Sequence, residues 1–249
     1  MDSLQRFFRR PLAFVLSITI LGALISLPAA GLAYPWTLGI VDATFIWTPP
    51  PAIVESIPDC AYHLAKSTGY VAAKASGNEE SPLQVCLMKV MHSHGASQNA
   101  IAFAKWFYHA HRGDSAYITS LVTKPQYGPV QLAGIYYPGN ANNNQAYLFV
   151  NGTDPRVADP ASIFAPDGEP WNHDPQYQAI LHAHPRAMVY PALSFVNLQR
   201  REGGGQRFIL AAPVLDGCHA CARLATIDIA YDFGSLGSPK GANVVAVRQ

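Results

Sequence analysis

The sequence predicts an α+β fold in which N-terminal helices pack on an antiparallel sheet built from C-terminal hairpins. Three observations support this prediction. Apolar residues recur at helical spacing between residues 52 and 111, strand-like segments follow from residue 116 onward, and short turns rich in Gly, Asn and Pro separate those strands. Parallel pairing needs long crossover connections, which the late part of the chain lacks, so we expect consecutive strands to pair antiparallel. Helices followed by hairpins are the order typical of helices packed on one face of such a sheet.

The composition is that of a packed protein with little net charge. The chain has 249 residues, of which 49% are hydrophobic and 13% are charged, and its formal net charge is +1. This apolar content argues against intrinsic disorder. We expect no nucleic-acid partner, because a nucleic-acid-binding protein needs a basic face to displace counterions. Beyond the first ten residues, the basic residues cluster only at Arg200-Arg201.

Residues 1–33 are predicted to be a signal peptide for export. Arginines within the first ten residues give a positively charged start, and an almost unbroken apolar run follows over residues 11–27. Gly31 and Ala33 supply the small residues that signal peptidase requires, which predicts cleavage after Ala33. The run of about 17 apolar residues is close to the length that spans a bilayer, so an uncleaved N-terminal anchor is the alternative. The remaining chain is expected to be periplasmic or extracellular, with membrane contact only through this segment if it is uncleaved.

Two further boundaries divide the chain after the signal. Residues 34–51 are rich in Pro, Trp and Thr, and Pro49-Pro50-Pro51 favours an extended conformation, which predicts a Pro-rich arm. Residues 52–249 are expected to form a single α+β domain, because their number fits one core and no linker divides them.

Helical patterns come first in the expected domain. Residues 52–75 have broadly helical spacing, although Pro58 is expected to start a turn or break the segment. A second helix is predicted over residues 83–92, with Gly95 as its C-terminal cap. A third is predicted over residues 100–111, with Ser97 as its N-cap. A short helix is also predicted later in the chain, from Asp174 or Pro175 to about His182.

Strand patterns dominate after residue 116. The expected strands cover residues 116–123, 130–137, 145–150, 193–198, 206–214, 222–233 and 243–247. The polar turn over residues 139–144 predicts that the second and third of these form a hairpin. Within residues 222–233, apolar residues alternate with Asp228, Ala230 and Asp232, which is typical of a half-buried strand.

The four cysteines are expected to form disulfides in an oxidising compartment. Four cysteines allow three pairings. Proximity in the sequence favours Cys218 with Cys221 and Cys60 with Cys86, without proving it.

The Cys218-His219-Ala220-Cys221 segment is the densest chemical signal, and it has three interpretations. A redox site of the thioredoxin type would open a helix, whereas the residues after Cys221 alternate like a strand. A structural disulfide that closes a hairpin loop is therefore favoured. Thiol–disulfide chemistry and metal ligation at this spacing are the alternatives.

Six of the nine histidines occur as His-x-His pairs. His92 and His94, like His109 and His111, stand at expected helix ends, where capping and the helix dipole explain them. His182-Ala183-His184 leads into Pro185, where the backbone becomes extended and both imidazoles share one side. Together with His219, His182 and His184 are the candidate ligands for copper or zinc.

No sequence motif assigns an enzymatic activity or a cofactor. The chain lacks a Gly-x-Ser-x-Gly elbow, a His-Glu-x-x-His motif and a phosphate-binding glycine loop. Carboxylates in the connection over residues 154–174 are explained by ordinary turn chemistry, although a hydrolase without a motif is an alternative. Aromatic residues near expected loops could anchor a partner. They are Trp36, Trp47, Tyr136, Tyr137 and Trp171.

The sequence thus predicts an exported, disulfide-stabilised envelope or secreted protein. Its expected role is that of a non-enzymatic binding or assembly module for a protein or a small molecule, with no cofactor. The alternative is a thiol–disulfide or metal-handling protein centred on Cys218 and Cys221.

Overall fold

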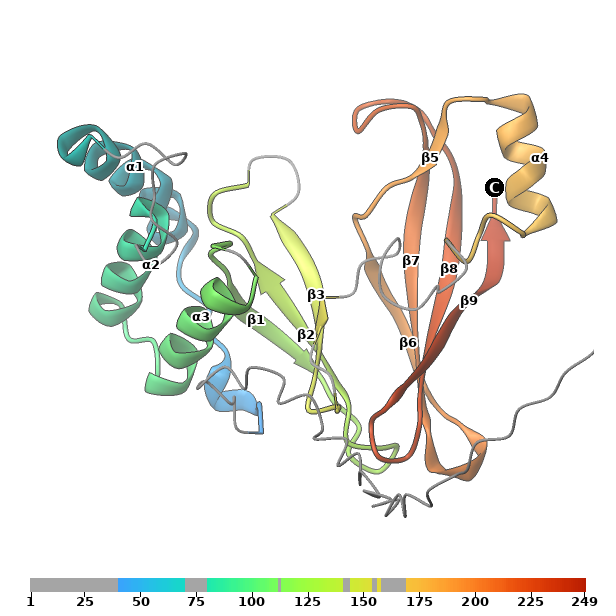
Figure 1. Ribbon diagram of the computed structural model, residues 1–249, viewed down its shortest axis with the longest axis horizontal. Coiled ribbons are helices and arrows are strands. Elements are labelled where there is room, and N and C mark those ends of the chain that lie inside the picture. The colour runs from blue at the N-terminus through green and yellow to red at the C-terminus, as the bar shows by residue number, and fades with distance from the viewer. Residues whose placement is uncertain (1–39, 70–79, 112, 141–143, 154–155, 158–168) are drawn as a thin grey trace, which may run out of the picture. The chain divides into compact units, whose positions relative to one another are not determined.

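The computed structural model describes residues 40–69, 80–111, 113–140, 144–153, 156–157 and 169–249. The predicted signal peptide and Trp36 lie outside these residues, so cleavage after Ala33 stays a prediction. Among the described residues, no helix is both long enough and apolar enough to span a bilayer. Within the described chain the α+β fold is confirmed, with three long helices followed by antiparallel strands (Figure 1).

Helix α1 covers Pro51–Thr68 and corrects the expectation for Pro58. The helix begins with Pro51 in its first turn, where proline is favoured because no N–H partner is needed. It then continues through Pro58 without a break, although proline there removes one backbone hydrogen bond. Ile57 is fully buried beside it and the Pro58 ring faces solvent, so packing of the inner face holds the helix together. Gly69 ends the helix in a left-handed conformation.

Helices α2 and α3 confirm the predicted caps. Helix α2 covers Pro82–Ser93, and Gly95 follows it with a φ of 74°. The N–H of Ala96 donates to the carbonyl of Met91 at 3.0 Å, which satisfies one of the last carbonyls of α2. Helix α3 covers Gln98–Ala110, and the Ser97 hydroxyl accepts a hydrogen bond from the N–H of Ala100.

The first sheet contains four antiparallel strands in the order β1-β2-β3-β4. The strands are β1 (Tyr117–Val122), β2 (Gln131–Tyr136), β3 (Gln145–Val150) and β4 (Arg156–Val157). The predicted hairpin between β2 and β3 is confirmed, with Gln131 opposite Val150 and Tyr136 opposite Gln145. Before β1, Val41, Phe45 and Trp47 are buried, so this part of the Pro-rich segment belongs to the core.

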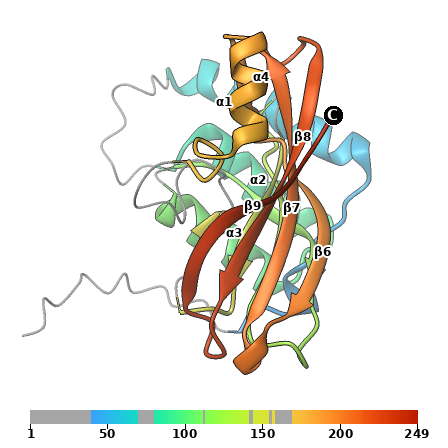
Figure 2. The same cartoon turned by 90° about the vertical axis from the view of Figure 1, so that its right-hand side faces the viewer.

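The second sheet contains five strands and ends the chain. They are β5 (Ala187–Val189), β6 (Ser194–Arg200), β7 (Gln206–Asp216), β8 (Arg223–Phe233) and β9 (Pro239–Arg248). Strand β7 pairs with β8, and β9 forms the outer edge; β5 and β6 both pair with the other side of β7 (Figure 2). The predicted short helix is α4, which covers Pro175–Ala183. The Asp174 carboxylate caps it.

The two faces of the first sheet are buried by different partners. One face packs against α3, where Phe103 and Phe107 meet Ile135 and other residues of β1–β3. The other face packs against the second sheet, where the ring of Phe149 lies 5.3 Å from that of Phe208. Helix α4 adds Tyr177 and Ile180 to this second cluster. The sequence predicts one sheet, but the late strands form a sheet of their own because each sheet needs a partner for its apolar face.

Candidate functional site

The β7–β8 hairpin presents the Cys-x-x-Cys segment at its tip. Its two strands have eleven residues each, and their pairing runs from Gln206 opposite Phe233 to Leu215 opposite Arg223. The side chains of Cys218 and Cys221 form a disulfide within the connecting loop. The expected strand after Cys221 is confirmed, so these cysteines close a hairpin loop and do not open a helix.

Backbone hydrogen bonds close the hairpin independently of this disulfide. The N–H of Asp216 donates to the carbonyl of Ala222 at 3.0 Å, and the N–H of Cys221 donates to the carbonyl of Cys218 at 3.1 Å. Gly217 starts the loop with a φ of 84°, a conformation that favours glycine. A Cβ built on Gly217 would lie 2.9 Å from the Cβ of Arg186 and 3.6 Å from its Cδ. The Arg186 side chain therefore runs beside the start of the loop.

Strand β5 places further side chains beside the loop. Met188 pairs with Leu215 of β7, and the N–H of Tyr190 donates to the carbonyl of Pro213. Met188 and Tyr190 are two positions apart along the strand direction, so they share one face of the sheet. The Tyr190 ring lies 4.8 Å from the imidazole of His219. Met188, Cys218 and His219 are exposed, and Tyr190 and Cys221 are half-buried. We call this set the tip surface; it consists of Arg186, Met188, Tyr190, Cys218, His219 and Cys221.

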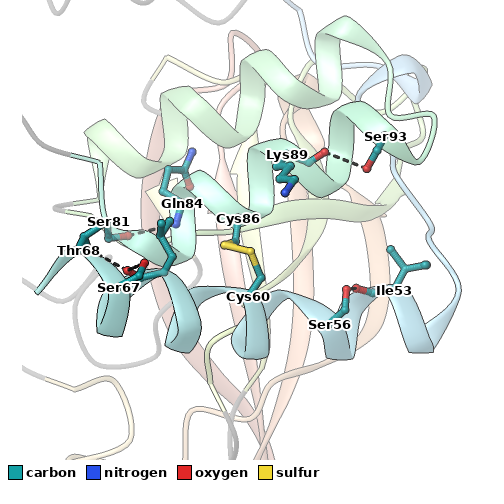
Figure 3. Close-up of a disulfide and its surroundings, with 11 residues drawn as sticks. Ile53, Ser56, Cys60, Ser67, Thr68, Ser81, Gln84, Cys86, Lys89 and Ser93 are labelled. Carbon is teal, nitrogen blue, oxygen red and sulfur yellow. Dashed lines mark hydrogen bonds between the residues drawn. A yellow bond between two sulfur atoms is a disulfide. The ribbon is translucent and has the colours of Figure 1, made fainter. Parts of the chain in front are cut away.

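The second disulfide has a different setting. Cys60 of α1 is bonded to Cys86 of α2, and Figure 3 shows the bond lying between the two neighbouring helices. Cys86 is 1% exposed and packs with Leu87 and Met91 in the helical core cluster. The pairing favoured by proximity is therefore confirmed for all four cysteines. Two intramolecular disulfides indicate folding in an oxidising compartment.

The two disulfides differ in the stability that they supply. Cys60 and Cys86 are 26 positions apart, whereas Cys218 and Cys221 are 3 apart. Loop-closure entropy gives about 3.5 kcal/mol for the longer loop and about 2 kcal/mol for the shorter one. The bond between the helices is thus the main staple, and the bond at the tip is less needed for the fold.

The predicted metal ligands are not brought together. His182 stands in the last turn of α4, His184 is its C-cap, and His219 faces Tyr190. Among the described residues, no group of three or more His, Cys, Asp or Glu side chains is arranged to hold a metal ion. The other two His-x-His pairs lie at the ends of α2 and α3, where His94 and His111 are the C-cap residues. The helix-end interpretation of these pairs is confirmed.

Some residues singled out from the sequence have structural roles. Trp47 and Trp171 are 5% and 2% exposed, so the expectation that they anchor a partner was wrong. Tyr136 and Tyr137 are half-buried, and burial raises the pKa of Tyr137 to about 12. Of the carboxylates in the 154–174 connection, Asp174 caps α4, and residues 154–155 and 158–168 lie outside the described residues.

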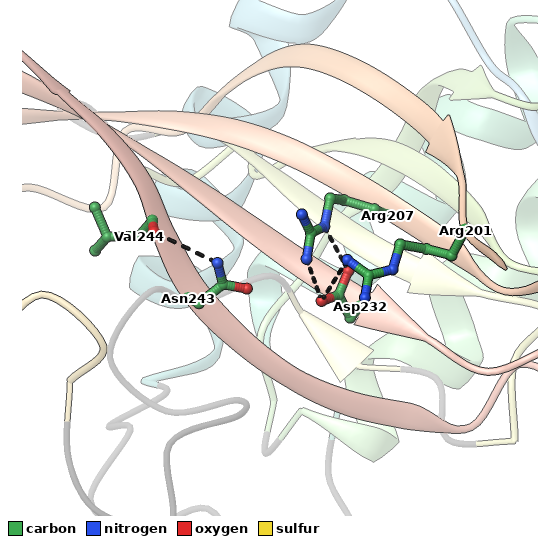
Figure 4. Close-up of polar contacts among 5 residues, drawn as sticks. All are labelled: Arg201, Arg207, Asp232, Asn243 and Val244. Atoms are coloured by element: carbon green, nitrogen blue, oxygen red, sulfur yellow. Dashed lines mark hydrogen bonds and ion pairs between the residues drawn. The ribbon is translucent and has the colours of Figure 1, made fainter.

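Charged pairs on the face of β8 that carries Asp228 and Asp232 were not predicted from the sequence. Arg207 of β7 donates two hydrogen bonds of 2.7 Å to the Asp232 carboxylate, and Arg201 approaches the same carboxylate at 3.6 Å (Figure 4). Arg248 of β9 pairs similarly with Asp228 at 2.6 Å. The hydrogen bonds that Arg207 donates to the Asp232 carboxylate raise the pKa of Arg207 above its ordinary value. Arg207 lies directly opposite Asp232, and Arg248 lies diagonally across from Asp228, which explains these two pairs as cross-strand contacts of the sheet.

A shallow groove lies between the start of α4 and β9. Its volume is about 400 Å³, and its lining residues are Asp174, Pro175, Gln176, Val244, Val245, Ala246 and Val247. Asp174 is already engaged as the helix cap, and no other ionisable side chain lines the groove. The tip surface therefore has more charged and reactive side chains than this groove.

Comparison with known proteins adds no family to this description. No protein-family model, curated protein or solved structure matches the chain.

Proposed function

We propose that the chain is exported through its N-terminal segment and binds a partner protein outside the cytoplasm through the tip surface. The predicted signal peptide and the two disulfides support an exported, disulfide-stabilised protein of the periplasm or the extracellular space. If the segment is not cleaved, it anchors the same domain to the membrane.

The observation that carries this proposal is the exposed loop that the Cys218–Cys221 disulfide closes on a rigid hairpin. Loops held by a rigid scaffold are the usual location of binding residues, and an already closed loop loses little conformational entropy on binding. Met188, Tyr190 and Arg186 lie beside this loop, and Met, Tyr and Arg are the residue types that interfaces favour. The expected partner presents an apolar surface with carboxylates toward Arg186.

Site-specific photocrosslinking in the native cells tests this proposal. A photoreactive phenylalanine analogue replaces His219 in one variant, and in the control variant it replaces Tyr62, which is 66% exposed on α1. We expect a discrete adduct from position 219 and none from position 62. The adduct should decrease about tenfold when Tyr190 is also changed to Ser, because the change removes an aromatic contact.

Two results would count against binding at the tip surface. One is the same adducts from both positions, which would indicate random collisions. The other is an adduct from position 219 that Tyr190→Ser leaves unchanged. Export itself is checked in the same cells by cell fractionation.

A further inference from the structure

The two cysteines of the tip disulfide differ in exposure as whole residues. Cys218 is exposed at the end of the loop, whereas Cys221 is half-buried where the chain enters β8. Thiol–disulfide exchange requires a thiolate to approach one sulfur atom of the bond, so access selects which sulfur is attacked. The structure therefore directs an incoming thiolate to Cys218.

We expect the hairpin to stay intact when this bond opens. The hydrogen bond from Asp216 to Ala222 closes the loop outside the disulfide, and strand pairing continues directly below it. The Cys60–Cys86 bond, in contrast, joins two helices, and its Cys86 is buried in the helical core cluster, against which the half-buried Cys60 packs. The two disulfides are thus expected to respond differently to a reductant: one is a shielded staple, and the other is an exposed bond that the fold does not require.

Positive charge flanks the tip. Arg186 runs beside Gly217, which immediately precedes Cys218. Arg223 follows Cys221 by two residues, and its guanidinium donates a hydrogen bond to the Thr226 hydroxyl further along β8. Nearby cations stabilise a thiolate relative to a thiol and make a cysteine pair more reactive. Asp216 is the only carboxylate residue between Leu215 and Arg223.

From these observations we propose that Cys218–Cys221 is a thiol–disulfide exchange site for an exported dithiol protein. The partner's thiolate attacks the sulfur of Cys218, which forms a mixed disulfide and releases the thiolate of Cys221. The partner's second thiolate then attacks the partner's first sulfur, which is bonded to Cys218 in the mixed disulfide. This forms the partner's disulfide and releases the thiolate of Cys218. The partner gains a disulfide, the hairpin gains a dithiol, and the two protons of the partner's thiols pass to the two cysteines.

This inference goes beyond the proposed binding function and does not depend on it, because exchange can be measured with a small dithiol alone. The first experiment uses the full, oxidised chain in buffers with increasing ratios of reduced to oxidised dithiothreitol. Thiols are alkylated at each ratio and mapped by mass spectrometry, while circular dichroism follows the fold. We expect the Cys218–Cys221 bond to open at a ratio at least about tenfold lower than the Cys60–Cys86 bond, with no change in the spectrum. Opening of both bonds together, or opening of the tip only as the protein unfolds, would overturn the proposal.

A second experiment compares the two sulfur atoms directly. The Cys221→Ser variant leaves Cys218 as a free thiol, and the Cys218→Ser variant leaves Cys221. Both keep the Cys60–Cys86 staple, so both are expected to fold. With oxidised glutathione as the probe, Cys218 should form a mixed disulfide about tenfold faster than Cys221, because it is the more exposed of the two. Equal rates would contradict attack at Cys218.

The role of Arg186 is tested in the Cys221→Ser variant. Arg186→Gln should slow the reaction of Cys218 about threefold near neutral pH and shift the midpoint of its pH–rate profile upward, because the thiolate loses a nearby cation. The control is Arg200→Gln, a similar change at an exposed arginine opposite Gln206, at the other end of β7. If both changes slow the reaction equally, Arg186 has no specific role in the exchange.

Discussion

His111 shows how a local environment sets the charge of one side chain. Its backbone caps α3, and its imidazole stacks on the ring of Phe107 at a centroid distance of 4.1 Å. Burial lowers the pKa of His111 from its ordinary value of 6.5, and the nearby Asp114 carboxylate opposes this effect only in part. The folded protein therefore holds His111 in its neutral form more strongly than the unfolded chain does.

This lowered pKa predicts a loss of stability in mild acid. Well above pH 6.5 the imidazole is neutral in both states and contributes no pH dependence. As the pH falls below that value, the unfolded chain binds a proton first, so the free energy of unfolding decreases until the folded state is also protonated. Urea unfolding at a series of pH values should show a smaller decrease for His111→Gln than for the wild-type protein. The control is His92→Gln at the exposed end of α2, and identical pH profiles for all three proteins would rule out His111 as a source of the decrease.

At the scale of single elements, signals that act within a few residues were predictable from the sequence. Ser97 begins α3 and Gly95 terminates α2 as expected, because such a signal is recognised from the residue itself and the turn beside it. The disulfide at the tip was predictable for the same reason. The continuation of the helix through Pro58 was not predictable, because it depends on the burial of Ile57 and on the Cys60–Cys86 bond, which are tertiary interactions.

The two prolines of α1 give a matched test of this explanation. Pro58→Ala restores a backbone N–H in the helix interior and should raise the free energy of unfolding by about 1–2 kcal/mol, after allowance for the more flexible unfolded chain. Pro51→Ala changes the first turn, where no hydrogen bond is lost, and should alter stability by no more than about 0.5 kcal/mol. Urea unfolding of both variants measures the difference. A destabilised Pro58→Ala variant would mean that the helix requires the proline geometry at this position.

At the scale of the whole molecule, the packing of one sheet on the other could not be predicted from the sequence. Alternation identifies which side of a strand is buried, but it does not identify the partner that buries it. Phe149 and Phe208 are 59 positions apart in the chain, yet their rings are in contact. The candidate site has the same limit: Cys218 and His219 were predicted, whereas the neighbouring Met188 and Tyr190 became apparent only from the pairing of β5 with β7.

Gln206 makes a buried polar connection between the two sheets. Its side chain is fully buried; its amide oxygen accepts a hydrogen bond from the N–H of Val130 at 2.8 Å, and its amide nitrogen donates to the carbonyl of Val130 at 2.9 Å. Gly128 allows this close approach, because a Cβ there would lie 2.6 Å from the oxygen of the Gln206 side chain. A buried backbone N–H and carbonyl outside regular pairing are thus both satisfied by one side chain.

Replacing Gln206 should therefore weaken the joint between the sheets. Gln206→Leu removes both hydrogen bonds and leaves two buried polar groups of Val130 without partners, which should lower the free energy of unfolding by about 2–4 kcal/mol. Gln199→Leu on the exposed side of β6 is the control, with an expected change within about 0.5 kcal/mol. Urea unfolding measures both variants, and hydrogen exchange of the Val130 amide locates the effect. If Gln206→Leu lowers stability while the Val130 amide stays as protected as in the wild-type protein, the loss comes from the altered packing of β7, and the hydrogen bonds to Val130 are not what joins the sheets.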